Sequence, residues 1–307
     1  MGLDIVAAFF VFGAIAQLLG APIKMPKGLY QSLTIFLLIA IGLKGGIALA
    51  ENASGALLWQ SLAVIAFGAL LPLIAFPVLW KVGGLTREDS ASVAAHYGSI
   101  SVGTFAVALA VLEANQIAFE PYFALFVALL EVPAIAVGLL LARGAGAHKG
   151  LKSLCHEMFL NQGVLLLVGS LIIGWLGAAQ TSKLMPFFGT LFYGVLALFL
   201  LEMGRQAASR VGLILQFGSF IASFAVLMPL VGALLGAGLA SVLGLSAGGT
   251  VLLATLGASA SYIAVPAAMA NALPEANQSL SITASLSITF PFNVLVGIPL
   301  YLAVIVQ

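Results

Sequence analysis

Charge is scarce in this sequence. Only 7% of the 307 residues are charged, whereas soluble domains carry about 25%. Hydrophobic residues make up 62% of the chain, and the mean hydropathy is +1.20. Apolar runs of about 17 to 25 residues, the length that spans a bilayer, recur from one end of the chain to the other. The composition therefore predicts a polytopic membrane protein and leaves no room for a soluble domain of ordinary size.

Cysteine and aspartate are almost missing as well. Cys155 is the single cysteine, which excludes an internal disulfide and disfavours a cysteine-based metal site. Asp4 and Asp89 are the only aspartates, and neither lies mid-membrane. Intramembrane aspartyl proteases, prenyltransferases and cation/proton antiporters need aspartates there. A serine protease needs a base beside its nucleophile, and His96 is the only intramembrane histidine, so the sequence argues against an enzyme.

The net charge is +1, and the basic residues stand singly at the ends of apolar runs, so no nucleic-acid partner is indicated. The first residues, Met-Gly-Leu-Asp, lead into apolar sequence without a basic segment. We therefore expect a membrane helix at this end and not a cleaved signal peptide.

The apolar runs predict an all-α fold with ten transmembrane helices. They lie at about Leu3–Leu19, Leu29–Ala50, Ala56–Leu79, Ala91–Leu112, Pro121–Ala142, Met158–Ala178, Met185–Met203, Val211–Leu235, Gly249–Ala272 and Leu280–Val306.

Basic residues set the expected orientation. Nine of the eleven fall in the odd-numbered loops, namely Lys24, Lys27, Lys81, Arg87, Arg143, Lys149, Lys152, Arg205 and Arg210. The positive-inside rule then places these loops in the cytoplasm and both termini outside. Because each half has five spans, an odd number, the second half enters the membrane from the face opposite to the first. We therefore expect two inverted five-helix repeats, residues 1–142 and 158–307, joined by a cytoplasmic linker at 143–157.

One motif is written twice, once in each half. The stretches His96–Gln116 and Leu256–Gln278 each contain a small-residue interruption, then an Ala-rich apolar run, then Glu-Ala-Asn-Gln. The interruptions are Gly-Ser-Ile-Ser at 98–101 and Ala-Ser-Ala-Ser at 258–261. Interrupted membrane helices at matching places in two halves point to the binding site of a transporter.

Inversion makes the fourth and ninth spans antiparallel, so their inner half-helices can direct N-termini toward one another. Each N-terminus carries free N–H groups and a partial positive charge, which suits an anion without any Arg or Lys. Hydroxyl groups near the breaks can cap these ends and coordinate a cation; they belong to Ser99, Ser101, Thr104, Ser259 and Ser261. The alternative is that small residues serve close helix packing. Two matched clusters favour the binding site.

Glu131 lies within an apolar span, where a charge costs roughly 2.5 to 3.5 kcal/mol. Pro133 and Pro291 occupy matching places in the two halves, and Asn293 follows the second proline. Each proline frees a backbone carbonyl on the preceding turn. We expect side-chain oxygens of a sodium site from Ser101, Thr104, Glu131, Ser261, Thr289 and Asn293. The alternative is a structural Glu131 paired with a neighbouring helix.

Three other polar features each allow two interpretations. Lys44 and Glu202 either pair with each other or are ordinary helix-end charges, and inversion favours the second. His96 is either a pH sensor or, as we expect, a hydrogen-bonded structural residue. The basic linker is either a plain connection or a docking patch for an acidic cytosolic partner.

Three segments resemble the sodium-dependent bicarbonate transporter family typified by the cyanobacterial permease. They are GASASYIAVPAAM followed by LPEAN, TASLSITFPFNVLVGIPLY, and IGLKGGIAL. The resemblance extends over nearly the whole chain. It implies crossed discontinuous helices 4 and 9, core and gate domains each drawn from both repeats, a homotrimer, an elevator-like movement and a cytosolic PII-like regulator.

The resemblance also implies which residues hold the substrate. The family tetrad at the first break matches Ser101, Val102, Gly103 and Thr104, and the one at the second break matches Ser259, Ala260, Ser261 and Tyr262. The chain departs from the pattern at Gly103, which lacks a hydroxyl, and at Glu131, where the cyanobacterial type has Asp. The sequence thus predicts sodium-coupled symport of bicarbonate across a bacterial cytoplasmic membrane. The alternative is a sodium-coupled carrier of another small anion, such as an organic carboxylate.

Overall fold

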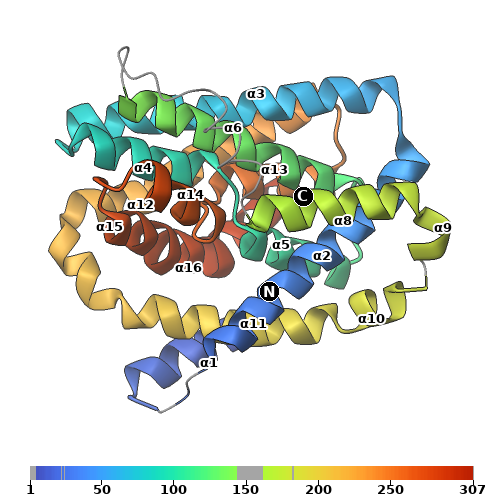
Figure 1. The fold of residues 1–307 in the computed structure, drawn as a ribbon, viewed down its shortest axis with the longest axis horizontal. Helices are drawn as coiled ribbons and strands as arrows, with labels where there is room; N and C mark the ends of the chain where they lie inside the picture. The colour runs from blue at the N-terminus through green and yellow to red at the C-terminus, as the bar shows by residue number, and fades with distance from the viewer. Residues whose placement is uncertain (1–4, 22, 24, 144–161, 182, 307) are drawn as a thin grey trace.

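The computed structural model describes residues 5–21, 23, 25–143, 162–181 and 183–306 (Figure 1). Within these ranges the chain is helical and contains no strand, which confirms the predicted all-α class. The first half consists of α1 (Ile5–Leu18), α2 (Lys27–Asn52), α3 (Gly55–Pro77) with its π-helical continuation η1 (Val78–Val82), α4 (Arg87–Gly98), α5 (Val102–Ala114) and α6 (Phe123–Arg143).

The second half begins with α8 (Gln162–Leu176), the short α9 (Ala178–Thr181) and α10 (Met185–Thr190), α11 (Phe192–Ser209) and α12 (Val211–Val242). It continues with α13 (Ala247–Ala258) and α14 (Ala264–Ala272). The last apolar segment combines α15 (Gln278–Ile282), η3 (Thr283–Thr289), α16 (Phe290–Phe292), η4 (Asn293–Gly297) and α17 (Ile298–Ile305).

Several helices are long and apolar enough to cross a membrane. Among the described residues there are six, at Lys27–Asn52, Gly55–Val82, Arg87–Ala114, Phe123–Ala142, Val211–Val242 and Gln278–Ile305. Three shorter apolar helices, α1, α8 and α13, accompany them. Large apolar side chains such as Leu18, Leu215 and Leu234 are exposed, as they are in a protein whose outer surface meets lipid. These helices make the chain a multi-pass membrane protein, whereas the number of ten spans stays a prediction.

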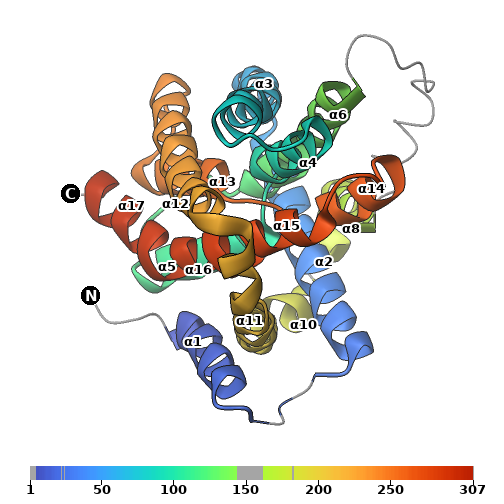
Figure 2. The same cartoon turned by 90° about the vertical axis from the view of Figure 1, so that its left-hand side faces the viewer.

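Two helix pairs combine the two halves: α1 lies against α11, and α2 lies against α8. Within the first half α3, α4 and α6 contact one another, and within the second half α12 contacts α13 and η3. Figure 2 shows α1, α2 and α11 on one side and α3, α4, α6, α12 and α13 on the other. The first arms of the two broken segments, α4 and α13, therefore belong to the second group.

Glycine permits the closest of these helix crossings. A side chain at Gly204 on α11 would collide with the backbone of Phe10, and one at Gly13 on α1 would collide with the backbone of Leu201. Gly232 on α12 meets Gly257 on α13 in the same way. Small residues bring helix backbones into contact where lipid supplies no hydrophobic driving force.

Helix α12 is longer than the sequence predicts. It continues to Val242, beyond the expected end at Leu235. The small-residue stretch after Leu235 stays helical because Gly236 packs against the backbone of Leu253 on α13. A kink at Gly218, with φ of 81°, bends the helix near its start.

Candidate functional site

Both predicted interruptions are present as breaks between helices. Helix α4 ends at Gly98, and Ser99 is extended with ψ of 171°. Helix α13 ends at Ala258, and Ser259 is extended with ψ of 162°. The two halves therefore break at equivalent residues of the doubled motif. Serine suits these places because its hydroxyl bonds the local backbone more readily than it supports a helix interior.

The two breaks touch each other. The Ser101 N–H donates to Ser259 Oγ at 3.1 Å, and the Ser261 N–H donates to the carbonyl oxygen of His96 at 2.8 Å. Each break thus satisfies a backbone donor of the other half. These buried hydrogen bonds fix the relative position of the two interruptions, which lie far apart in the sequence.

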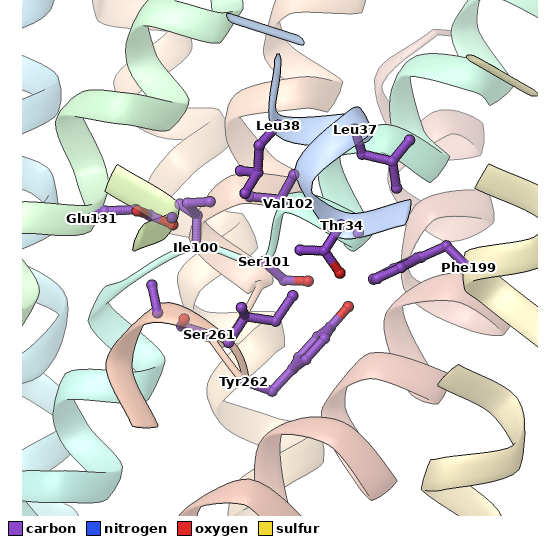
Figure 3. A pocket seen from close by; sticks show the side chains of 14 residues that line it. Thr34, Leu37, Leu38, Ile100, Ser101, Val102, Glu131, Phe199, Ser261 and Tyr262 are labelled. Carbon is purple, nitrogen blue, oxygen red and sulfur yellow. The ribbon is translucent and has the colours of Figure 1, made fainter. Parts of the chain in front are cut away.

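A pocket lies where the breaks meet. Six residues expected at the site line it: Ser101, Val102, Gly103, Glu131, Ser261 and Tyr262. Figure 3 shows the side chains of these residues other than Gly103. The other lining residues come from α2, α8, α11 and the edges of the breaks: Thr34, Leu37, Leu38, Ile100, Gly163, Phe199, Ile263 and Ala264.

Two helix N-termini border this pocket. Val102 and Gly103 are the first two residues of α5, and Ala264 is the first residue of α14. The first N–H groups of a helix have no acceptor within it, and the helix dipole adds about half a positive charge. Ser101 Oγ caps α5 by accepting from the Thr104 N–H at 3.1 Å. The pocket therefore presents donors and positive potential, which suit an anion.

Glu131 lies on α6 and brings a carboxylate to the same pocket. Its side chain is 2% exposed, and Oε2 has no hydrogen-bond partner. Among the described residues the salt bridges are Lys44–Glu113 and Arg205–Glu202, so neither basic side chain pairs with Glu131. A buried carboxylate that stays charged needs a cation beside it. The hydroxyls of Ser101 and Ser261, which line the same pocket, are suitable neighbours for a hard cation.

Other predicted ligands lie outside the pocket lining. Thr289 donates to the carbonyl of Ala225 at 2.7 Å and bonds the Tyr97 hydroxyl at 2.7 Å. Asn293 donates to the carbonyl of Ala258 at 2.8 Å. Through these bonds the last span supports the C-terminal ends of α4 and α13. Their role as sodium ligands stays a prediction.

Four further predicted residues are buried at the breaks without lining the pocket: Ser99, Thr104, Ser259 and Ala260. Ser259 Oγ both accepts from Ser101 and donates to the Leu256 carbonyl at 2.8 Å. The hydroxyls of Ser99 and Thr104 have no partner. These two are thus polar atoms close to the site that the protein itself leaves unsatisfied.

Sequence reasoning missed the part of the pocket supplied by α2 and α11. Thr34 and Phe199 lie within regular apolar helices and belong to no repeated motif. The single available signal was Thr34, the last hydroxyl before an apolar run that begins at Ile35. The packing of α2 against α6 and α11, and of α11 against α5, brings these residues to the pocket.

Lys44 and Glu202 each have a partner other than the one the sequence offered. Lys44 Nζ lies 3.9 Å from Glu113 Oε1 and 4.9 Å from the centre of the Phe192 ring. Glu202 pairs with Arg205 at 2.6 Å. Lys44 and Glu202 therefore do not pair with each other. His96 is buried, its Nδ1 lies 2.7 Å from the Ser92 carbonyl oxygen, and its Nε2 has no hydrogen-bond partner; its structural role stays a prediction.

Two further expectations concern metals and the linker. The described residues contain no group of three or more His, Cys, Asp or Glu side chains arranged to hold a metal ion. A sodium site would instead depend on hydroxyl and carbonyl oxygens with one carboxylate. The linker expected at 143–157 lies, after Arg143, outside the described residues.

Two interrupted helices from opposite halves of a polytopic membrane protein, meeting at a buried polar pocket, are typical of a secondary transporter. The family comparison agrees: the chain belongs to the Na⁺-dependent bicarbonate transporter superfamily, whose family model matches residues 6–306. No curated protein matches the chain. The predicted family is thereby confirmed. Membership implies Na⁺-dependent transport of bicarbonate, and a family of transporters implies a protein that is not an enzyme.

Proposed function

We propose that this protein is a symporter that couples uptake of bicarbonate to sodium across the cytoplasmic membrane of a bacterium. One observation carries the proposal: two helix N-termini and the buried carboxylate of Glu131, whose Oε2 has no hydrogen-bond partner, border the same pocket. The N-termini favour an anion, and the carboxylate favours a cation. A site that binds the anion and the cation together more tightly than either alone is the physical basis of symport.

The bound bicarbonate accepts hydrogen bonds from the first turn of α5 and lies at the positive end of the α14 helix dipole. The sodium ion lies beside Glu131, with oxygens from Ser101 and Ser261. Thr104, Thr289 and Asn293 are further proposed oxygen donors, and Ser99, Ser259, Ala260 and Tyr262 complete the proposed substrate site. Each ion offsets the charge of its neighbour, so loading with both lowers the cost of moving through the low-dielectric interior.

The route from this pocket supports alternating access. A second pocket shares Thr34, Leu38, Gly163 and Ile263 with the first and continues to Gln31 and Gln162. It thus leads toward the first turns of α2 and α8. The positive-inside rule assigns that end to the cytoplasm. The pathway therefore fits a carrier whose site is open to the cytoplasmic side.

At the opposite end of α2, Lys44 pairs with Glu113 on α5, and Glu113 also accepts from the Tyr193 hydroxyl on α11. We name Lys44, Glu113 and Tyr193 the outer latch. It joins a broken helix to both neighbouring helices and closes the outer side in this conformation.

The packing pattern supports an inverted repeat of ten spans. When each helix is replaced by its counterpart in the other half, the α1–α11 contact becomes the α8–α2 contact. In the same way α3–α4 becomes α12–α13, and α3–α6 becomes α12–η3, and all of these contacts are present. An elevator-like movement would carry the broken helices past α1, α2, α8 and α11. We further propose that both termini lie outside, on the basis of the charge distribution. A homotrimer and a PII-like regulator complete the proposal, on the basis of the family resemblance.

Uptake of labelled bicarbonate into proteoliposomes tests the function. We expect accumulation that requires a sodium gradient and stops when choline replaces sodium. Unchanged uptake in choline would reject symport. Competition by small organic carboxylates separates the alternative substrate: a carboxylate that abolishes bicarbonate uptake at lower concentration than bicarbonate itself would identify the carboxylate as the substrate.

A further inference from the structure

An apolar cavity lies between α3, α6 and α8, apart from the pocket at the breaks. Its volume is about 610 Å³, which is within the range of about 300–1,000 Å³ that ligand sites have in proteins. Every residue that lines it is an alanine, glycine, isoleucine, leucine, proline or valine. Two of these residues, Leu165 and Ile172, are 53% and 43% exposed. The cavity therefore opens to the surface that faces lipid, and it offers no polar side chain to an ion.

Helix α8 packs tightly on one face and leaves space on another. On the first face, a Cβ at Gly174 would lie 2.6 Å from the carbonyl oxygen of Leu43, so α8 and α2 touch there. Gly169 lines the cavity, and a Cβ added to it has no neighbouring atom within 4 Å. Glycine in membrane helices usually brings two backbones into contact. At Gly169 no described part of the chain occupies the space that glycine leaves.

Contacts in the two halves identify the counterpart of this cavity. Gly46 on α2 meets the backbone of Leu171 on α8, in the way that α11 meets the backbone of Phe10 on α1 through a glycine. Leu171 and Phe10 are therefore counterparts under the proposed inverted repeat. Val132 and Phe290 correspond as well, because each directly precedes one of the two matching prolines.

Aromatic rings fill the counterpart place. The rings of Phe10 and Phe290 meet edge to face, with centroids 5.4 Å apart. Leu171 and Val132 are smaller side chains, and both line the cavity. The space between α6 and α8 is thus not a general consequence of the fold, because the same arrangement of helices is filled where the residues are aromatic. It calls for an apolar molecule to replace the contacts that the two rings make.

A single turn of α6 separates the cavity from the pocket at the breaks. Glu131 lines that pocket, and Figure 3 shows its side chain pointing into it. The next two residues, Val132 and Pro133, line the cavity. On α8 the boundary is equally narrow, since Gly163 lines the pocket and Val164 lines the cavity. A molecule in the cavity therefore contacts the same turn of α6 that carries the carboxylate.

We propose that the cavity binds one acyl chain of a membrane lipid, packed against the turn of α6 that carries Glu131. Water is a poor occupant, because it needs two to four polar partners. A helix of a second copy is about 10–12 Å across with its side chains, as wide as α6 or α8 itself, whereas a hydrocarbon chain fits into a space between neighbouring helices. The bilayer supplies such chains at this depth. The inference goes beyond transport and does not depend on which ion is carried.

Photolabelling of the full chain in lipid nanodiscs tests the site. The nanodiscs contain a trace of phosphatidylglycerol with a diazirine on one acyl chain, and mass spectrometry locates the label after illumination. We expect more label on Val132 and Val168, which line the cavity, than on Leu227 and Leu234 of α12. The two leucines are 58% and 75% exposed, so they report contact with bulk lipid. Label no stronger at the cavity than on α12 would reject a specific site.

Gly169→Leu fills the cavity from within, because its side chain enters open space. We expect the label on Val132 and Val168 to fall to the level of α12. Gly238→Leu is the matched control: Gly238 is exposed on α12, also has no atom within 4 Å of an added Cβ, and should leave the label unchanged. Gly169→Ala guards against a folding defect in the larger variant and should lower the label part of the way.

Thermal unfolding in digitonin, a detergent with a rigid steroid group, gives an independent measurement. Both leucine variants gain helix propensity, but only Gly169→Leu also fills empty space, so it should unfold at a higher temperature than Gly238→Leu. A neutral monoacylglycerol, which has no charge for the pocket at the breaks, should raise the melting temperature of the unaltered protein by about 2–4 °C or more. It should not shift that of Gly169→Leu. An equal shift in both would place the acyl chain elsewhere.

The remaining outcomes separate this inference from symport. If Gly169→Leu folds and keeps the label on Val132 and Val168, the acyl-chain site is wrong and the symport proposal stands. Leu165→Cys, in a chain with Cys155→Ala, tests the other occupant: disulfide-linked dimers together with absence of label would assign the cavity to an interface between copies and overturn the proposal. Uptake that ignores sodium would reject symport and leave the acyl-chain site intact.

Discussion

The N–H of Ser261 donates a hydrogen bond of 2.8 Å to the carbonyl oxygen of His96. This bond joins the second break directly to the last turn of α4. Both residues are buried, so water cannot replace the bond at low cost. The contact fixes the two breaks as one unit. This coupling underlies the predictions that follow.

Glu131→Gln replaces the carboxylate with a neutral amide of nearly the same shape. We expect the sodium concentration for half-maximal bicarbonate uptake to rise about tenfold or more, because a charge-assisted contact to the cation is lost. In sodium-free buffer the same variant should unfold at a higher temperature than the unaltered protein, since it no longer buries an uncompensated charge.

Glu51→Gln, at the exposed end of α2, is the control and should leave both measurements unchanged. Sodium dependence preserved in Glu131→Gln would remove Glu131 from the proposed cation site. A stability loss in sodium-free buffer would instead favour the alternative reading, a glutamate with a structural partner.

Ser261→Ala tests the other side of the cation site. Ser261 Oγ accepts from the Val265 N–H at 3.3 Å and lines the pocket with Glu131. Loss of the hydroxyl should weaken the sodium dependence of uptake several-fold and lower stability by about 0.5–2 kcal/mol, the usual effect of removing a capping side chain.

Ser241→Ala is its matched control, because the Ser241 hydroxyl donates to the Ala237 carbonyl on the exposed face of α12. Titration of uptake against sodium compares the two variants. Equal sodium curves for both would exclude Ser261 as a ligand.

The doubled motif was readable from the sequence because the same small-residue interruption recurs at matching places in the two halves. That match located the breaks at Ser99 and Ser259, and the cost of a charge in an apolar span singled out Glu131. Thr34 and Phe199 could not be found this way. They belong to unbroken helices, and their place at the pocket depends on how α2 packs against α6 and α11, and α11 against α5.

The hydrogen-bond partners of Thr289 and Asn293 were equally hidden. Both looked like sodium ligands because hydroxyls and amides suit the ion. In the structure each already bonds a neighbouring segment, Thr289 to Tyr97 and Asn293 to the end of α13. A residue type limits which bonds are possible, and only the three-dimensional neighbours determine which of them form.

The outer latch predicts a conformational bias. Lys44→Met removes the 3.9 Å pair with Glu113. The Lys44 and Glu113 side chains are 30% and 34% exposed, so the pair is worth only about 0.2–1 kcal/mol and its loss should change the equilibrium constant toward an outward-open state by a factor of about 1.4 to 5. Labelling of Gln31→Cys, in a chain with Cys155→Ala, reports access from the cytoplasmic side and should slow by at most that factor. Unchanged labelling would show that the latch does not hold this conformation.

Close helix crossings predict where the fold is least tolerant. Gly204→Ala places a methyl group against the Phe10 carbonyl and the Ala14 backbone, which belong to a neighbouring helix and cannot yield as a flexible side chain would. We expect a loss of about 1–3 kcal/mol in unfolding free energy, the usual cost of overpacking. Gly194→Ala lies on the same helix with nothing within 4 Å of the added atom. It should be neutral or slightly stabilising, because alanine favours helix over glycine. Thermal unfolding in detergent compares the two variants, and equal melting temperatures would contradict the proposed α1–α11 crossing.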